Sequence, residues 1–203
     1  IIVNDGSTDD SQDRAKQFSD ERIRLFSQEN KGVSAARNHG MAEAKGQYFC
    51  FLDADDEWTP DYLENLYKTI QKFPNAGMYC SRYKTKIGKN HFTECQLTDL
   101  PENYEGYVQD FFKSSYVNRV ALTSAVTIDR QVFLEIGGFD TNITHGEDLD
   151  YWIKIVLHYP IAICSKVTMI YNSTPNNVNL SKTDYVQSKL HDLNQFNIEE
   201  KGN

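Results

Sequence analysis

Short apolar runs alternate with longer helix-like segments through the first 83 residues, and this alternation constrains the fold more than any other feature. Strands are expected at residues 1–3, 23–26, 48–52 and 77–83, with helices ending at about 18 and spanning about 33–44 and 60–73. Strands separated by helices of this length form βαβ units, in which the strands run parallel. The sequence therefore predicts an α/β fold with a mostly parallel central sheet flanked by helices.

The second half of the chain carries weaker signals. Residues 84–103 are polar and lack periodicity, so we interpret them as a variable excursion and not as a linker between domains. Further strands are expected at 123–128, 161–164 and 167–171, and helices at 130–136, 147–159 and about 184–198. We expect all of these elements to belong to a single domain.

The composition limits the class of protein. The chain has 203 residues, of which 39% are hydrophobic and 12% aromatic, enough to bury one large core. The formal net charge of −8 makes the chain a poor candidate for nucleic-acid binding, which requires a basic face. No apolar run approaches the length of a membrane span, and no signal peptide is visible.

The cysteines show neither a metal-binding nor a paired spacing. Cys50, Cys80, Cys95 and Cys164 lie far apart, and no Cys-x-x-Cys motif occurs. Cys50 and Cys164 fall within strand-like apolar runs. We therefore expect four reduced thiols that act as small hydrophobic side chains in a reducing compartment.

Three carboxylates follow the apolar run 49–52, in the sequence Asp53-Ala54-Asp55-Asp56. Clustered carboxylates repel one another, and oxygen ligands of this kind bind Mg²⁺ or Mn²⁺ together with phosphate. An EF-hand loop is disfavoured because Trp58 stands where the sharp turn needs glycine and a strand precedes the loop. A solvated acidic turn before a helix stays open as an alternative.

Two earlier segments could also contact an anionic ligand. Asp5 directly follows the first strand, where a carboxylate can accept a hydrogen bond from a base or a ribose hydroxyl. Arg37 lies in the second turn of a helix lined with small residues, near an electropositive helix start. The alternatives are a strand-to-helix turn for Asp5 and a solvated surface charge for Arg37.

A later segment, Glu147-Asp148-Leu149-Asp150, begins an amphipathic helix whose buried face includes Trp152. Asp148 near the helix start should stay ionised at neutral pH, as a general base that accepts a hydroxyl proton must. The alternative is an acidic first turn that complements the helix dipole.

Taken together, these segments resemble the family-2 inverting glycosyltransferases of the GT-A fold, the fold of nucleotide-diphospho-sugar transferases. Any one motif is weak, but their order along the chain from residue 1 to about 152 is specific. The matching segments are Asn4-Asp5-Gly6-Ser7-Thr8-Asp9, 30–38, Asp53-Ala54-Asp55, Gly137-Gly138-Phe139-Asp140 and Glu147-Asp148-Leu149-Asp150.

The resemblance implies a role for each site residue. Asp5 would bind the base, Arg37 would lie near the nucleotide, and Asp53 would contact the ribose. Asp55 would ligate Mn²⁺ or Mg²⁺ on the diphosphate, and Asp148 would be the catalytic base. The implied reaction is metal-dependent inverting transfer of a sugar from a nucleotide-sugar donor, UDP-linked by preference, to an acceptor hydroxyl.

The resemblance also implies the organisation of the chain. Residues 1–203 would form one domain, with a nucleotide-binding half at about 1–83 and an acceptor and catalytic half at about 104–182. The acceptor would be a glycan or a lipid-linked molecule in polysaccharide or glycoconjugate synthesis. A cytoplasmic location is expected, with peripheral association with the inner face of the membrane left open.

The sequence departs from the family pattern in three places. Asn4 replaces the first Asp of the family's pair, and the segment Tyr171-Asn172-Ser173-Thr174 lacks the Arg or His found in many relatives. The family's first strand and helix would precede Ile1 and are absent from the chain as given. We therefore expect a GT-A fold without its N-terminal strand and helix, and a fragment whose activity is in doubt.

Two alternative functions remain at this stage. A sugar-1-phosphate nucleotidyltransferase also uses metal-binding Asp residues, but it should carry a Gly-rich phosphate loop, which is not visible. A non-catalytic module that binds nucleotide or glycan would use the same residues without turnover. A glycoside hydrolase is disfavoured because an Asp-x-Asp at a strand end, together with Arg37, suits a phosphate ligand better.

Overall fold

The computed structural model describes residues 1–89 and 91–173, so the helix expected at 184–198 lies outside the described residues. The strands are β1 (Ile2–Asp5), β2 (Leu25–Gln28), β3 (Tyr48–Cys50), β4 (Glu57–Trp58), β5 (Met78–Ile87), β6 (His91–Glu94), β7 (Gly106–Tyr107), β8 (Val126–Asp129) and β9 (Ile161–Ser173). The helices are α1 (Ser11–Lys16), α2 (Val33–Glu43), α3 (Tyr62–Lys72), α4 (Phe111–Ser114), the 3₁₀ turn η1 (Thr123–Ala125), α5 (Arg130–Ile136) and α6 (Glu147–Val156).

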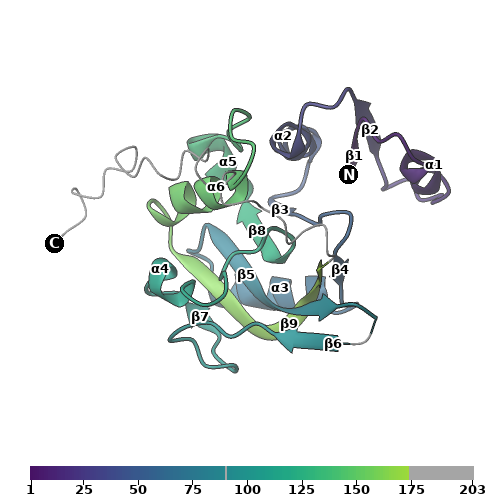
Figure 1. Cartoon of the computed structure of the whole chain (residues 1–203). Coiled ribbons are helices and arrows are strands. Elements are labelled where there is room, and N and C mark those ends of the chain that lie inside the picture. Colours follow the sequence, from purple (N-terminus) through teal and green to yellow (C-terminus); the bar gives the residue numbers. More distant parts are fainter. Residues whose placement is uncertain (90, 174–203) are drawn as a thin grey trace.

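The described strands form two sheets (Figure 1). β1 and β2 pair in parallel as a small sheet, which lies with α1 and α2 beside the main body. The main sheet has seven strands in the order β3-β8-β5-β9-β4, with β6 added to β5 and β7 added to β9. The α/β prediction is confirmed.

The prediction of a mostly parallel sheet is wrong. Within the main sheet only β5 and β9 pair in parallel, and the other five pairings of its described strands are antiparallel. The β3–α3–β5 unit does place two strands in the same direction, since both run antiparallel to β8. However, β8 comes from much later in the chain and inserts between them, which local alternation of strands and helices cannot reveal.

The core lies on both faces of the main sheet. Met78 and Cys80 of β5 point to one face and pack in a cluster that contains Trp152 of α6. Tyr79 points to the other face and packs with Ile70 of α3. The sheet is therefore the middle layer, with α6 on one side and α3 on the other.

Several element boundaries differ from the sequence-based expectations. The strands expected at 161–164 and 167–171 belong to one strand, β9, whose pairing with β5 shifts register between Ile163 and Val167, where the sequence predicts a break. The excursion expected at 84–103 instead continues β5 and forms a hairpin with β6. The strand expected from Thr123 begins with the η1 turn.

Two further features concern the cysteines and the helices. Cys80, Cys95 and Cys164 are buried, Cys50 is half-buried, and all four are free thiols. Among the residues that the structure describes, no helix is both long and apolar enough to cross a membrane.

Asn38 of α2 joins the N-terminal part of the chain to the loop after α5. Its Nδ2 donates to the Phe139 carbonyl at 2.8 Å, and its Oδ1 accepts from the Phe139 N–H at 2.8 Å. The approach is close enough that a Cβ at Gly138 would lie 2.3 Å from Asn38 Oδ1. Glycine is therefore required at position 138 for this contact to form.

We expect Asn38→Ala to lower the free energy of unfolding by about 1–3 kcal/mol, because it leaves both backbone groups of buried Phe139 without their side-chain partner. Urea denaturation measures this change. Asn142→Ala is the control, because the Asn142 side chain bonds to Asp140 at an exposed position, and the substitution should cost less than about 0.5 kcal/mol. If both variants lose the same free energy of unfolding, the bonds from Asn38 to Phe139 do not stabilise the fold more than an exposed side-chain bond does.

Candidate functional site

The acidic loop Asp53–Asp56 sits at the end of β3, as the sequence predicts. The Phe51 N–H donates to the Val126 carbonyl at 3.3 Å, and the Asp56 N–H donates to the Asp53 carbonyl at 3.1 Å, which closes a turn. The chain then enters β4, which pairs with β9. The loop is therefore fixed at both ends by the main sheet.

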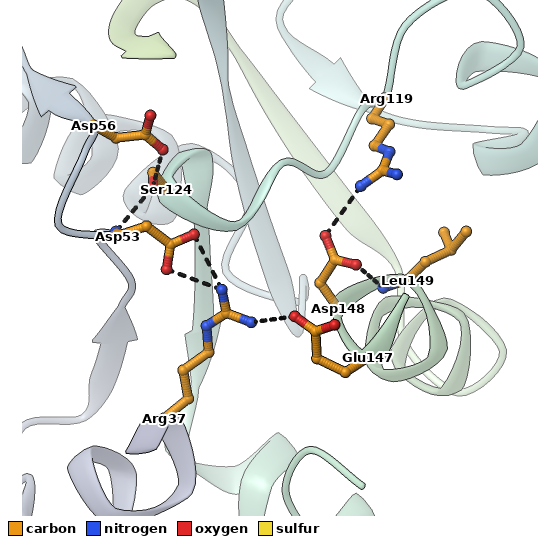
Figure 2. A network of polar contacts seen from close by, with 8 residues as sticks. All are labelled: Arg37, Asp53, Asp56, Arg119, Ser124, Glu147, Asp148 and Leu149. Atoms are coloured by element: carbon orange, nitrogen blue, oxygen red, sulfur yellow. Dashed lines mark hydrogen bonds and ion pairs between the residues drawn. The ribbon is translucent and has the colours of Figure 1, made fainter. Parts of the chain in front are cut away.

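Arg37 connects this loop to two distant helices (Figure 2). Its Nη2 donates to both carboxylate oxygens of Asp53, at 2.9 and 3.0 Å, and its Nη1 donates to Glu147 Oε1 at 2.9 Å. The Arg37 side chain is only 11% exposed, which rules out the solvated surface charge. One guanidinium thus brings together α2, the acidic loop and the start of α6.

The surroundings of Arg37 favour its charged form. Burial opposes the charged form, but the carboxylates of Asp53 and Glu147 outweigh it and raise the pKa of Arg37 above its ordinary value. The guanidinium carbon also lies 5.3 Å from the centre of the Phe139 ring, within the range of a cation–π contact. Arg37 therefore offsets the repulsion between the Asp53 and Glu147 carboxylates.

Asp148 lies in the first turn of α6, which follows Gly146 in the left-handed region at φ 78°. Its Oδ1 accepts the Leu149 N–H at 2.8 Å, and its Oδ2 accepts from Arg119 Nη1 at 3.1 Å (Figure 2). The Asp148 side chain is 13% exposed and that of Arg119 is 43% exposed. The carboxylate is thus oriented on one side by the helix and on the other by a cation open to solvent.

Asp5 lies in the N-terminal part of the chain and holds the loop before α2. Its carboxylate accepts hydrogen bonds from Gln28 Nε2 at 2.8 Å and from the N–H groups of Lys31 and Gly32, both at 2.9 Å. Asp5 therefore serves in part as a residue of the strand-to-helix turn, which was the alternative to base binding. A carboxylate has about four acceptor positions, so one is left for a ligand, and base binding stays a prediction.

Asp56 has partners on both sides. Its Oδ2 accepts from Ser124 Oγ at 2.5 Å, and its Oδ1 accepts from the Asn172 N–H at 3.2 Å. Burial raises the pKa of Asp56 above its ordinary value, although the bonds from Ser124 and Asn172 act in the opposite direction. Asn172 Nδ2 also donates to the Asp55 carbonyl at 2.7 Å.

Sequence reasoning missed Ser124 and Arg119 and gave Asn172 no role. Ser124 and Arg119 belong to no motif, and all three reach the site from elements far away in sequence. The only available signal was the segment 171–174, which stands where many relatives place a diphosphate contact.

Whether a divalent metal fits this loop depends on the contacts and the exposure of its carboxylates. Asp53 is bonded to Arg37, and Asp56 is bonded to Ser124 and Asn172. Asp55 is an exposed residue of the same loop. Among the described residues no group of three or more His, Cys, Asp or Glu side chains could hold a metal. Mg²⁺ typically binds one or two carboxylates plus substrate phosphates, so the loop fits a metal that is shared with a ligand.

The fold is that of the GT-A glycosyltransferases. The crystal structure of S. aureus TarS in complex with UDP superposes with a TM-score of 0.68 at 18% identity, covering 87% of this chain and 51% of that one. The structure of S. aureus TarS with UDP-GlcNAc gives a TM-score of 0.69 at 17% identity, covering 85% and 49% of the two chains.

The sequence comparisons identify the family. The model of glycosyl transferase family 2 matches residues 1–137, and the chain belongs to this family. An uncharacterized glycosyltransferase of Rickettsia prowazekii is 30% identical over 156 residues, which cover 76% of this chain and 48% of that protein. An uncharacterized glycosyltransferase of Haemophilus influenzae is 25% identical over 154 residues, covering 71% and 51%. The chain thus spans about half the length of these curated relatives.

Proposed function

We propose that the protein transfers a sugar from a UDP-linked donor to an acceptor hydroxyl, with inversion and with a divalent metal. The observation that carries this proposal is the contact of Arg37 with both Asp53 and Glu147, beside Asp148. It gathers three separate motifs at one end of β3. The UDP and UDP-GlcNAc complexes of S. aureus TarS support a uridine nucleotide as the donor class.

The donor would be held by residues from three elements. Asp53 would contact the ribose, and Asp5 would use its remaining acceptor capacity for the base. Arg37 keeps Asp53 in place through two hydrogen bonds and would lie near the nucleotide. Asp55 would hold Mn²⁺ or Mg²⁺ together with the diphosphate. A bound metal would offset the charge that develops on the departing diphosphate.

Asp148 would act as the catalytic base. As the acceptor oxygen attacks the anomeric carbon, its proton would pass to Asp148 Oδ2, and the bond from the anomeric carbon to the diphosphate oxygen would break. Attack from the face opposite the leaving group inverts the anomeric centre. Arg119 contacts the same oxygen, so the acceptor hydroxyl must share Oδ2 with this guanidinium or displace it.

The acceptor would be a glycan or a lipid-linked molecule. This proposal follows from the family alone, and it includes a cytoplasmic location with peripheral contact with the inner face of the membrane. The test is to incubate the full-length protein with UDP-sugars and with either soluble or membrane-derived acceptors. The rate of UDP release with each acceptor identifies the acceptor class.

We expect the full-length protein to bind UDP in the presence of Mn²⁺ and to lose most of this affinity when EDTA removes the metal. The exposed Asp55 carboxylate and the diphosphate each supply only part of the coordination shell, so neither partner should bind the metal well alone. Isothermal titration calorimetry with and without Mn²⁺ measures the difference. Failure to bind any nucleoside diphosphate would contradict the proposed function, and equal binding in EDTA would contradict the metal role.

A further inference from the structure

We propose that Ser124 is a positioning residue of the donor site, and that it acts together with Asp56. We call the hydrogen-bonded pair Ser124 and Asp56 the loop brace. The loop brace rests on the proposed function, because its consequence is the placement of Asp53 and Asp55 for donor and metal. Asp56 is thereby assigned to the support of the loop and not to the metal.

The Ser124 hydroxyl makes two hydrogen bonds of opposite polarity (Figure 2). It donates to Asp56 Oδ2 at 2.5 Å and accepts from the Asp53 N–H at 3.0 Å. Ser124 is 0% exposed, so water cannot replace either bond without a rearrangement. A hydroxyl is the smallest side-chain group that can donate and accept at once, and alanine at this position could do neither.

These bonds act on the residues proposed to contact the donor. The bond to the Asp53 N–H fixes the backbone from which the Asp53 carboxylate extends toward Arg37. The bond to Asp56 fixes the far side of the turn, so Asp55 lies between the two anchored residues Asp53 and Asp56. The Ser124 carbonyl adds a third attachment, because it accepts from Trp58 Nε1 at 2.7 Å.

The loop is also held from its other side, which explains why Asp56 is unsuited to metal binding. Asn172 of β9 donates its N–H to Asp56 Oδ1 and its Nδ2 to the Asp55 carbonyl. Both oxygens of Asp56 are therefore engaged by the protein. A metal at Asp56 would have to compete with these two donors.

The test compares wild-type full-length protein with Ser124→Ala by calorimetric titration of UDP, with Mn²⁺ and with EDTA. We expect Ser124→Ala to weaken UDP binding in Mn²⁺ by about tenfold, the lower end of the effect of losing an outer-shell partner, because Ser124 supports the loop that carries Asp55 and does not bond to Asp55 itself. The affinity in EDTA should change less. A purely structural role would lower thermal stability without a selective loss of the Mn²⁺-dependent affinity.

Ser81→Ala is the matched control, because Ser81 is also buried but its hydroxyl has no hydrogen-bond partner among the described residues. We expect its UDP affinity to equal that of the wild type. Hydrogen–deuterium exchange of residues 53–57 provides a readout without ligand, and Ser124→Ala should accelerate it. If Ser124→Ala does not fold, Asp56→Asn is tested in the same way and should show the same selective loss.

The outcomes separate the loop brace from the proposed function. Wild-type protein that binds no UDP would contradict the proposed function, and the exchange measurement would still decide whether Ser124 holds the loop. Wild-type protein that binds UDP, with Ser124→Ala within about twofold of it and with unchanged exchange, would overturn the loop brace.

Discussion

Asp148→Asn should lower turnover of the full-length enzyme by about 10²–10⁴-fold while UDP affinity in Mn²⁺ stays within about twofold of the wild type. The amide keeps the size of the side chain and can still accept the Leu149 N–H, so the start of α6 should not move. It cannot take a proton from the acceptor hydroxyl. Steady-state release of UDP measures turnover, and calorimetry measures affinity.

The matched control for this variant is Asp110→Asn. Asp110 also accepts a backbone N–H at the start of a helix, that of Lys113, but it lies at an exposed position outside the site. Turnover of Asp110→Asn should equal that of the wild type. If Asp148→Asn keeps more than about a tenth of the wild-type turnover, the catalytic base is a different group.

Arg37→Met should lower the free energy of unfolding by about 2–4 kcal/mol and weaken UDP binding more than about tenfold. The change leaves Asp53 and Glu147 without their shared counter-charge, in a site where Glu147 is only 12% exposed. The estimate is lower than for a fully buried pair because Asp53 is 36% exposed and remains partly solvated. Urea denaturation and calorimetry with Mn²⁺ measure the two effects.

Arg22→Met is the control for the loss of an arginine ion pair. Arg22 pairs with Asp20, but its side chain is 86% exposed, so its loss should leave the free energy of unfolding almost unchanged. A loss below about 1 kcal/mol in Arg37→Met, together with unchanged UDP affinity, would show that Arg37 does not organise the site.

Local sequence patterns predicted the helices and strands better than the order and direction in which the strands pair. The 11-residue helices α2 and α3 lie close to their expected positions, because apolar periodicity and turn residues are local signals. The direction and order of the strands depend on β8, which enters the main sheet from a distant part of the chain. No local pattern carries that information, so the mostly parallel sheet was predicted wrongly.

The same difference between local and long-range information holds for the candidate site. Asp53 and Arg37 were singled out from their own motifs, and the structure places them in direct contact. The partners that hold these residues were not foreseen, because Ser124 and Arg119 are ordinary residues in segments without a motif. Their contribution depends on hydrogen bonds across the fold, such as the 3.0 Å bond from the Asp53 N–H to Ser124 Oγ.

A crystal structure of the full-length protein with UDP and Mn²⁺ tests the central claim most directly, because anomalous scattering locates the metal. We expect the manganese peak between the diphosphate and the Asp55 carboxylate, with the ribose beside Asp53. The Ser124 bond to Asp56 should remain in place. A manganese peak on Asp56, or a UDP molecule bound away from Arg37 and Asp53, would contradict the account.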